Sequence, residues 1–271
     1  MKYQRDRGFT LVELAVVTLI IGLLLSGILI SITTSQDQRN VEETQRQMAQ
    51  VVEAVYGFAA VNGRLPCPAT ATSGGREAFC TNDSGACGAE IAADPPATPA
   101  PAHGRCMSHF SGFAPGVTLG ISPTDNLGIV IDAWNNRLRY AVTDQNTNAF
   151  TRAPAATVGI QGIWRDPAQG ATALTPDLRV CNTAAGITGA GTAAANCPSG
   201  NQLTASAVAV VFSVGKNGAA APSGADEAAN AIGSNDRVFV FHSTTQTFDD
   251  QVVWLSPNVL YNRMIAAGRL P

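Results

Sequence analysis

Glu13 is the residue of this chain whose chemistry most needs an explanation. It is the one charged residue between Phe9 and Ile32, in a run that is otherwise almost wholly apolar. An ionised side chain costs about 2 to 3 kcal/mol at the centre of a bilayer and less near its edges. An acid in such a run is therefore a candidate functional residue, and a partner for its charge has to be found.

The six cysteines form a second group of residues with a chemical role. Their number is even, and all of them follow the apolar run: Cys67, Cys80, Cys87, Cys106, Cys181 and Cys197. In an exported domain, such a set predicts disulfide bonds. The chain contains no Cys-x-x-Cys pair, so a thioredoxin-like motif or a zinc site has little support.

Other catalytic patterns in the chain lack their usual context. Ser213 and Lys216 fit a Ser-x-x-Lys spacing, but they follow a predicted strand, and the companion motifs of penicillin-recognising enzymes are missing. The three histidines, His103, His109 and His242, have neither metal-ligand nor catalytic-triad spacing. We therefore expect a protein that is not an enzyme.

The apolar run itself predicts where these residues lie. It is long enough for a membrane span, which needs about 20 apolar residues, and too long for the core of a typical signal peptide. Lys2, Arg5 and Arg7 precede it and outweigh Asp6, which favours a cytoplasmic N-terminus. The chain beyond Ser35 is then exported.

A known processing signal resembles the residues around Glu13. The segment is Gly8-Phe9-Thr10-Leu11-Val12-Glu13-Leu14, preceded by a short basic leader. It resembles the signal of type IV pilins and of type II secretion pseudopilins, in which a membrane-embedded prepilin peptidase cuts after the glycine and methylates the new N-terminal amine. The resemblance implies cleavage between Gly8 and Phe9 and a methylated Phe9. Glycine leaves the peptide bond open to a protease because it has no side chain.

The same resemblance gives Glu13 a partner. After cleavage the Phe9 ammonium is a cation at an apolar depth, where Glu13 of a neighbouring subunit is placed to neutralise it and fix the axial register. The partners implied are prepilin peptidase, other copies of the chain, further pilin-like subunits, an inner-membrane assembly platform and the membrane. Glu13 is thus expected to be an assembly contact rather than a catalytic acid.

The fold implied by the resemblance is the α+β pilin fold, a long N-terminal helix packed on an antiparallel sheet with loop insertions and disulfides. The helix is expected to have a transmembrane half over residues 9–35 and an exported amphipathic half over residues 36–62. Apolar residues at helical spacing support the second half: Val41, Met48, Val51, Val52, Val55, Tyr56 and Ala59. Residues 1–8 form the leader, and residues 63–271 form a periplasmic or extracellular globular domain.

Local signals predict elements of this globular domain. Residues 132–140 resemble the segment that leads into the first strand of the sheet in major pseudopilins, with Asn135 and Asn136 in a turn because asparagine tolerates left-handed geometry. The patterns predict strands over 137–143, 205–214 and 237–242 and a final helix over 257–267.

The positions of the cysteines suggest how they pair. Cys181 and Cys197 bracket a Gly/Ala/Thr-rich insertion, so a bond between them is expected first. A Cys80–Cys87 bond is expected next, which leaves Cys67–Cys106 by elimination. Six cysteines allow many other connectivities, so these pairs are hypotheses.

A calcium site is a further hypothesis that comes from the resemblance. In major pseudopilins a C-terminal loop binds calcium, and residues 213–236 occupy the corresponding place. This loop holds hard oxygen donors of the kind that Ca²⁺ requires: Asp226, Glu227, Asn230 and Asp236. Their spacing departs from that of the family loop, so no metal ligand is assigned, and calcium is kept as an alternative.

The charge balance limits the partners. The leader carries Lys2, Arg5, Arg7 and Asp6, so its removal changes the formal net charge from −3 to −5. An acidic chain disfavours binding to nucleic-acid backbones, which requires clustered cations.

The sequence therefore predicts a pilin-like subunit of a type II secretion pseudopilus or a type IV pilus-like filament. Its expected location is the bacterial inner membrane and then a periplasmic or cell-surface filament. A minor type IV pilin for adhesion or motility is the alternative within this class. The alternative from another class is a single-pass, membrane-anchored exported binding protein or enzyme with an N-terminus that imitates the signal.

Overall fold

A computed structural model describes residues 10–154, 158–166, 168–192, 194–218, 220–231 and 237–271, with the backbone alone for residues 24–34. The chain forms two compact units, Met1–Glu42 and Glu43–Pro271. The boundary falls inside helix α1 (Leu11–Asn62), so each unit is described by itself. The long N-terminal helix predicted from the sequence is confirmed.

The C-terminal part of α1 belongs to the second unit and is amphipathic. Met48, Val51, Val55 and Ala59 are fully buried, and their spacing of three and four residues places them on one face of the helix. Gly63 follows the helix with a φ of 69°, a left-handed conformation that glycine adopts at helix ends without steric cost. The predicted stop after Asn62 is therefore confirmed.

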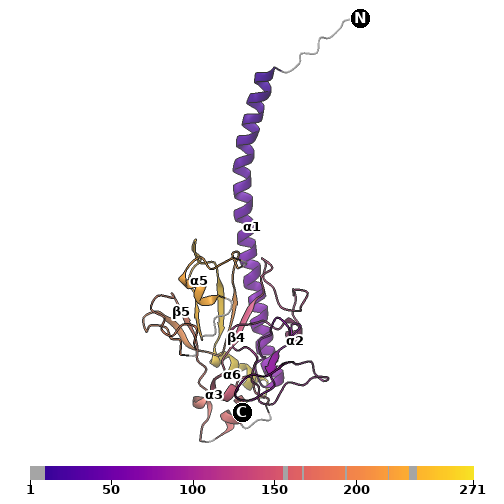
Figure 1. Cartoon of the computed structure of the whole chain (residues 1–271), viewed down its shortest axis with the longest axis vertical. Coiled ribbons are helices and arrows are strands. Elements are labelled where there is room, and N and C mark those ends of the chain that lie inside the picture. Colours follow the sequence, from indigo (N-terminus) through magenta and orange to yellow (C-terminus); the bar gives the residue numbers. More distant parts are fainter. Residues whose placement is uncertain (1–9, 155–157, 167, 193, 219, 232–236) are drawn as a thin grey trace. The chain divides into compact units, whose positions relative to one another are not determined.

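This helical face packs on a four-stranded antiparallel sheet (Figure 1). The strand order is β3-β4-β7-β9, with β3 at Gly112–Phe113, β4 at Arg139–Val142, β7 at Ala209–Ser213 and β9 at Gln251–Leu255. Leu138 and Tyr140 contribute to the core that includes α1, whereas Ala141 contributes to the core on the opposite face. The strand predicted over residues 137–143 is thus present as β4, although β4 is shorter than the predicted range.

A second sheet covers the face of the first sheet that lies away from α1. Its strands are β5 (Leu178–Cys181), β6 (Gln202–Ala207) and β8 (Val238–Val240), in the order β6-β5-β8. Leu178, Val180 and Phe239 pack there against Val210 and Phe212. The molecule is thus α+β as predicted, and the sheet under α1 is antiparallel as expected. The second sheet was not predicted, and in it β5 pairs with β6 antiparallel and with β8 parallel.

The strand predicted over residues 205–214 is also divided in the structure. Its first part belongs to β6 and its second part to β7, and these strands lie in different sheets. The run of small and apolar residues over 205–214 is unbroken in the sequence, so its pattern does not show where the chain passes from one sheet to the other.

Short elements complete the second unit. The strands β1 (Ala78–Cys80) and β2 (Glu90–Ala92) pair with each other. The short helices are α2 (Gly116–Leu119), α3 (Gln145–Asn148), α4 (Ile160–Arg165), the 3₁₀ helix η1 (Ala171–Ala173) and α5 (Ala225–Asn230). The predicted final helix is α6 (Pro257–Ala266), and it buries Leu260 and Met264 in the core beside α1.

Three disulfide bonds staple this unit: Cys67–Cys106, Cys80–Cys87 and Cys181–Cys197. The presence of disulfide bonds was expected from the even number of exported cysteines. The pairs are the three that the sequence favours. Cys181–Cys197 closes the loop between β5 and β6, and the disulfide and Ala195 of this loop form a small cluster with Val238 of β8.

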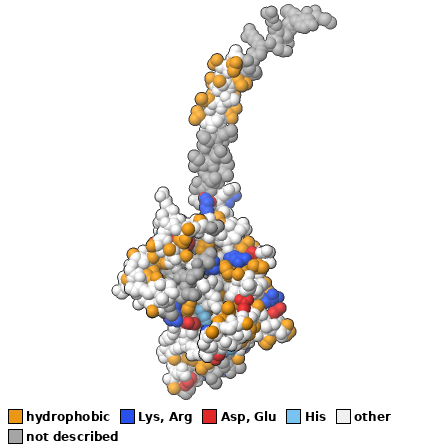
Figure 2. All heavy atoms as spheres, viewed as in Figure 1, with side chains coloured by type: hydrophobic (Ala, Val, Ile, Leu, Met, Phe, Trp, Pro, Cys, Tyr) orange, Lys and Arg blue, Asp and Glu red, His pale blue; other side chains and the backbone are white. Residues whose placement is uncertain are grey.

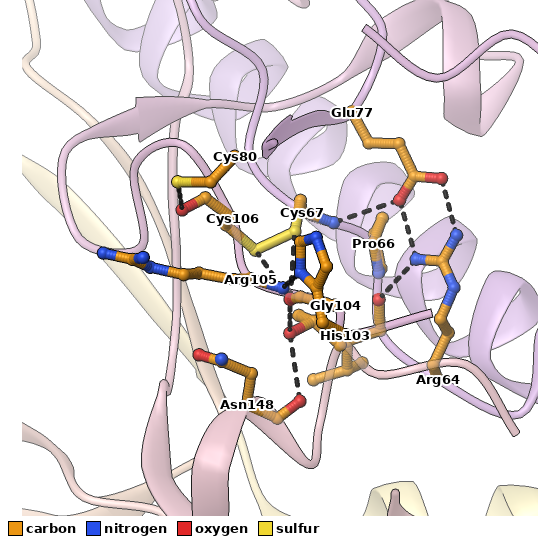
Figure 3. Close-up of a disulfide and its surroundings, with 12 residues drawn as sticks. Arg64, Pro66, Cys67, Glu77, Cys80, His103, Gly104, Arg105, Cys106 and Asn148 are labelled. Carbon is orange, nitrogen blue, oxygen red and sulfur yellow. Dashed lines mark hydrogen bonds and ion pairs between the residues drawn. A yellow bond between two sulfur atoms is a disulfide. The ribbon is translucent and has the colours of Figure 1, made fainter. Parts of the chain in front are cut away.

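A buried ion pair fastens the segment that follows α1. The guanidinium of Arg64 donates to both carboxylate oxygens of Glu77, at 2.7 and 2.6 Å, and the backbone N–H of Cys67 donates to the same carboxylate at 3.2 Å (Figure 3). Both charged side chains are buried. The pair lies beside the Cys67–Cys106 bond, so the segment after α1 has an ionic link to Glu77, which directly precedes β1, and a covalent link to Cys106.

No helix in the part of the chain that the structure describes is long and apolar enough to span a membrane. The transmembrane half expected over residues 9–35 is therefore not confirmed.

Candidate functional site

The first described residues of the chain form a hydrogen-bonded cap on α1. Thr10 directly precedes the helix, and its hydroxyl oxygen accepts a hydrogen bond from the backbone N–H of Glu13 at 3.3 Å. The same hydroxyl donates to the Glu13 carboxylate at 3.4 Å. This Thr-x-x-Glu spacing is that of a capping box, which satisfies backbone N–H groups that have no partner within the helix.

The cap gives Glu13 a local role that the sequence analysis missed. The sequence contains the signal for this cap, because a threonine three residues before a glutamate at the start of an apolar helix is a recognised N-terminal pattern. A carboxylate in the first turn also interacts favourably with the positive end of the helix dipole. The Glu13 side chain therefore has two separable properties, an oxygen that accepts a hydrogen bond from the capping Thr10 hydroxyl and a negative charge.

Gly8 and Phe9, the residues expected at the processing site, lie outside the described residues. Of the proposed assembly pair, the structure thus describes Glu13 and not Phe9. Cleavage between Gly8 and Phe9 and methylation of Phe9 stay predictions.

The first turns of α1 expose large apolar side chains. Hydrophobic atoms gather on the described part of this segment in Figure 2. The large apolar residues between 11 and 23 are each about half exposed or more: Leu11, Val12, Leu14, Val16, Val17, Leu19, Ile20, Ile21 and Leu23. An apolar surface of this kind marks a place where a membrane or another protein binds.

The residues considered for calcium do not form one site. Asp226 points to the Cys181–Cys197 loop, where its carboxylate accepts hydrogen bonds from Thr183 and Ala184 and contacts His242 at 3.1 Å. Burial raises the pKa of Asp226, but the hydrogen bonds outweigh it and hold the pKa below its usual range. Asn230 binds the backbone of Val240. Asp236 lies outside the described residues.

Glu227 instead belongs to a cluster with two other carboxylates, Asp249 and Asp250. Oxygen atoms of the three side chains lie within 4.8 Å of one another, next to a cavity of about 150 Å³ that Glu227 and Asp250 help to line. Asp249 and Asp250 are adjacent and directly precede β9, a signal that the sequence analysis did not use. Hard oxygen donors at this spacing suit a cation such as Ca²⁺.

The environment of the cluster disfavours its negative charge. Burial raises the pKa of Asp250 to about 7, and the charges of Glu227 and Asp249 act in the same direction. Burial also raises the pKa of Asp249. The amide of Asn230 donates to Asp250 at 2.9 Å, and this hydrogen bond stabilises the charged form of Asp250 in part. A bound cation or a shared proton would compensate the remaining charge.

Ser213, from the Ser-x-x-Lys pattern that lacks its catalytic context, has a structural role in the fold. Ser213 is fully buried, and its hydroxyl donates to Asp132 at 2.5 Å. Asp132 also accepts backbone hydrogen bonds from Trp134 and Asn136, which holds the predicted turn with Asn135 at a φ of 64°.

Of the histidines, His242 stacks on Phe248. His109 has its pKa lowered to about 4, mainly by burial. Ser213, His109 and His242 are therefore explained by their packing in the fold, without a catalytic role.

Comparison with known proteins gives one match. The family model of the prokaryotic N-terminal methylation motif matches residues 3–29. No curated protein and no solved structure matches the chain. The matched residues contain Glu13, its cap and the exposed apolar side chains of the first turns of α1. Residues 3–29 therefore match a prepilin-type methylation signal of the kind that type IV pilins and pseudopilins carry.

Proposed function

We propose that this chain is a pilin-like subunit that prepilin peptidase cleaves and N-methylates and that then assembles through its N-terminal helix. The filament would be a type II secretion pseudopilus or a type IV pilus-like fibre. Supporting the proposal, the methylation motif at residues 3–29 runs into a helix whose first turns expose their large apolar side chains.

The chemistry of assembly follows from this arrangement. In the membrane, the apolar run from Phe9 to Ile32 would hold the subunit in lipid, with the N-terminus on the cytoplasmic side. On leaving the membrane for the filament, the same side chains would pack against other subunits. The exported residues 43–271, with their own core and three disulfides, would form the outer part of the fibre in the pilin fold.

Glu13 would serve this assembly through its charge. The methylated ammonium of Phe9 is a cation without water once subunits pack, and a carboxylate of a neighbouring subunit would neutralise it. Leaving one partner of a buried ion pair uncompensated costs about 3 to 5 kcal/mol, and the cost would recur at every subunit contact.

Three variants separate the charge of Glu13 from its capping role. Glu13→Gln removes the charge and keeps an oxygen that can accept the hydrogen bond of the Thr10 hydroxyl, whereas Glu13→Leu removes both the charge and this acceptor. Thr10→Ala keeps the charge and loses the cap, at a typical cost of about 1 kcal/mol. We expect all three to be inserted and cut after Gly8, and we expect Thr10→Ala alone to enter filaments near the wild-type level.

The measurement is the amount of each processed variant in sheared filament fractions relative to the membrane fraction. Co-purification of Glu13→Gln with filaments at the wild-type level would show that the charge is not needed, and the proposed pairing with Phe9 would be wrong. A failure of Thr10→Ala together with Glu13→Leu would assign the defect to the cap.

A further inference from the structure

Two arginines among the described residues are buried and have opposite surroundings, Arg64 and Arg139. Arg64 is 7% exposed and is held bidentately by Glu77. Arg139, the first residue of β4, is 4% exposed. Among the described residues it has no carboxylate partner. Its Nη1 donates to the backbone oxygen of Ser111 at 3.4 Å, and its Nε is buried without a hydrogen-bond partner.

A second arginine increases the positive charge around Arg139. The guanidinium carbons of Arg139 and Arg137 lie 4.2 and 5.3 Å from the centre of the Phe113 ring. Such cation–π contacts compensate a buried cation in part. Arg137 is already paired, because its Nε donates to Asp125 at 2.7 Å. Burial, followed by the charge of Arg137, lowers the pKa of Arg139 to about 10.

These groups line a pocket. It has a volume of about 380 Å³ and lies where β3 ends and β4 begins, next to the loop that follows β7. Its lining includes both arginines, the Phe113 ring, Asn135 and the side chain of Val214. The pocket therefore combines a planar cation, an amide and apolar surface, and it has room for a small ligand or for one side chain.

We propose that this pocket binds a carboxylate group, with Arg139 as its counter-ion. An uncompensated buried guanidinium is strongly unfavourable, and a guanidinium matches a carboxylate through two parallel hydrogen bonds. The charge count selects a monoanion, because Asp125 neutralises Arg137 and leaves one cation unpaired. The apolar part of the lining, Phe113 and Val214, favours a carboxylate attached to carbon over a small, strongly hydrated anion.

Two sources can supply this carboxylate. One is a free carboxylate in solution, and this source is independent of the proposed function. The other is an Asp or Glu side chain of a neighbouring subunit, and this source rests on the proposed assembly. Since the two sources differ in their need for a second subunit, one experiment with two arms distinguishes them.

The first arm measures the melting temperature of the full chain in detergent at pH 7, in sodium acetate and in sodium chloride of equal ionic strength. We expect acetate to raise the melting temperature of the wild type by about 2 to 4 °C. Arg139→Met should not show this gain, and Arg263→Met, which removes an exposed arginine paired with Glu53, should keep it. Arg139→Gln replaces Arg139→Met if the latter does not fold.

The second arm places a photo-reactive residue at Val214 in cells that assemble the protein. A cross-link to another subunit that disappears with Arg139→Met would identify a neighbouring side chain as the source. A gain in acetate without such a cross-link would identify a free carboxylate. If Arg139 affects neither the acetate gain nor the cross-link, the proposal is wrong, even where the subunit assembles normally.

Discussion

The two ends of helix α1 are both rich in apolar residues but have opposite surroundings. Leu11, Leu19 and Leu23 are 87%, 65% and 67% exposed, whereas Met48, Val51 and Val55 are 0% exposed. The first end is apolar on all sides, and the second is apolar along one face. A single face can be covered by the sheet of the same chain, but a surface that is apolar all round needs cover from outside it. The comparison teaches that one helix can contain both a core element and an exposed apolar surface, which is where we propose that subunits assemble.

The largest change in the free energy of unfolding is expected at the buried Arg64–Glu77 ion pair, which follows the buried end of α1. Arg64→Met leaves Glu77 as a buried carboxylate without its cation, which should lower the free energy of unfolding by about 3 to 5 kcal/mol. Urea unfolding of the full chain in detergent measures this. Arg46→Met on the exposed side of α1, where Arg46 pairs with Glu43, should change it by less than about 1 kcal/mol. Equal losses of unfolding free energy in Arg64→Met and Arg46→Met would show that the buried ion pair stabilises the fold no more than the exposed one.

A direct test of the comparison truncates one apolar side chain at each end of α1. Met48→Ala should cost about 2 to 5 kcal/mol of unfolding free energy, since it opens a cavity in the core. Leu19→Ala should stay within about 0.5 kcal/mol, because its side chain is exposed within the described residues. A large loss for Leu19→Ala would mean that a part of the same chain covers this surface.

Within the covered unit, stability should depend on pH through Asp250. Its pKa is about 7 in the folded protein and about 4 in the unfolded chain. The folded state therefore binds more protons between these values, so stability should fall as the pH rises from 5 to 7, by about 2 kcal/mol in EDTA. Asp250→Asn should flatten this part of the profile. A wild-type profile that rises over the same interval would contradict the raised pKa.

The smallest effect concerns the carboxylate cluster as a cation site. Millimolar calcium should stabilise the wild type over EDTA by about 1 kcal/mol, because a cation bound by the folded state alone shifts the unfolding equilibrium. Asp249→Asn should abolish the gain, and Asp226→Asn, whose carboxylate faces another loop, should keep it. Identical melting curves in calcium and in EDTA would exclude the metal.

The sequence predicts well what local physics determines. The helix, its stop at Gly63, the turn at Asn135 and the final helix follow from periodicity and from residues with special backbone preferences. The motif around Glu13 is equally local. Prediction was weaker where residues distant in the sequence meet, because no local pattern records the contact. The division of residues 205–214 between two sheets, the parallel pair of β5 and β8, and the Arg64–Glu77 pair are such cases.

The candidate sites show the same limit. The four residues considered for calcium were chosen as one loop, but the fold turns Asp226 towards the disulfide loop and brings Glu227 to Asp249 and Asp250, which directly precede β9. The Thr10 cap was readable from its spacing to Glu13. The unpaired state of Arg139 was not, since an arginine in a strand usually has its charge in solvent or in an ion pair.

The N-terminus of the mature protein tests the central claim most directly. The full chain should be purified from the membranes of cells with an active prepilin peptidase and analysed by intact-mass and peptide mass spectrometry. The account predicts a chain that starts at Phe9 and carries one added methyl group, and a Gly8→Val variant that keeps residues 1–8. A membrane form of the wild type that still begins with Met1 would contradict the account.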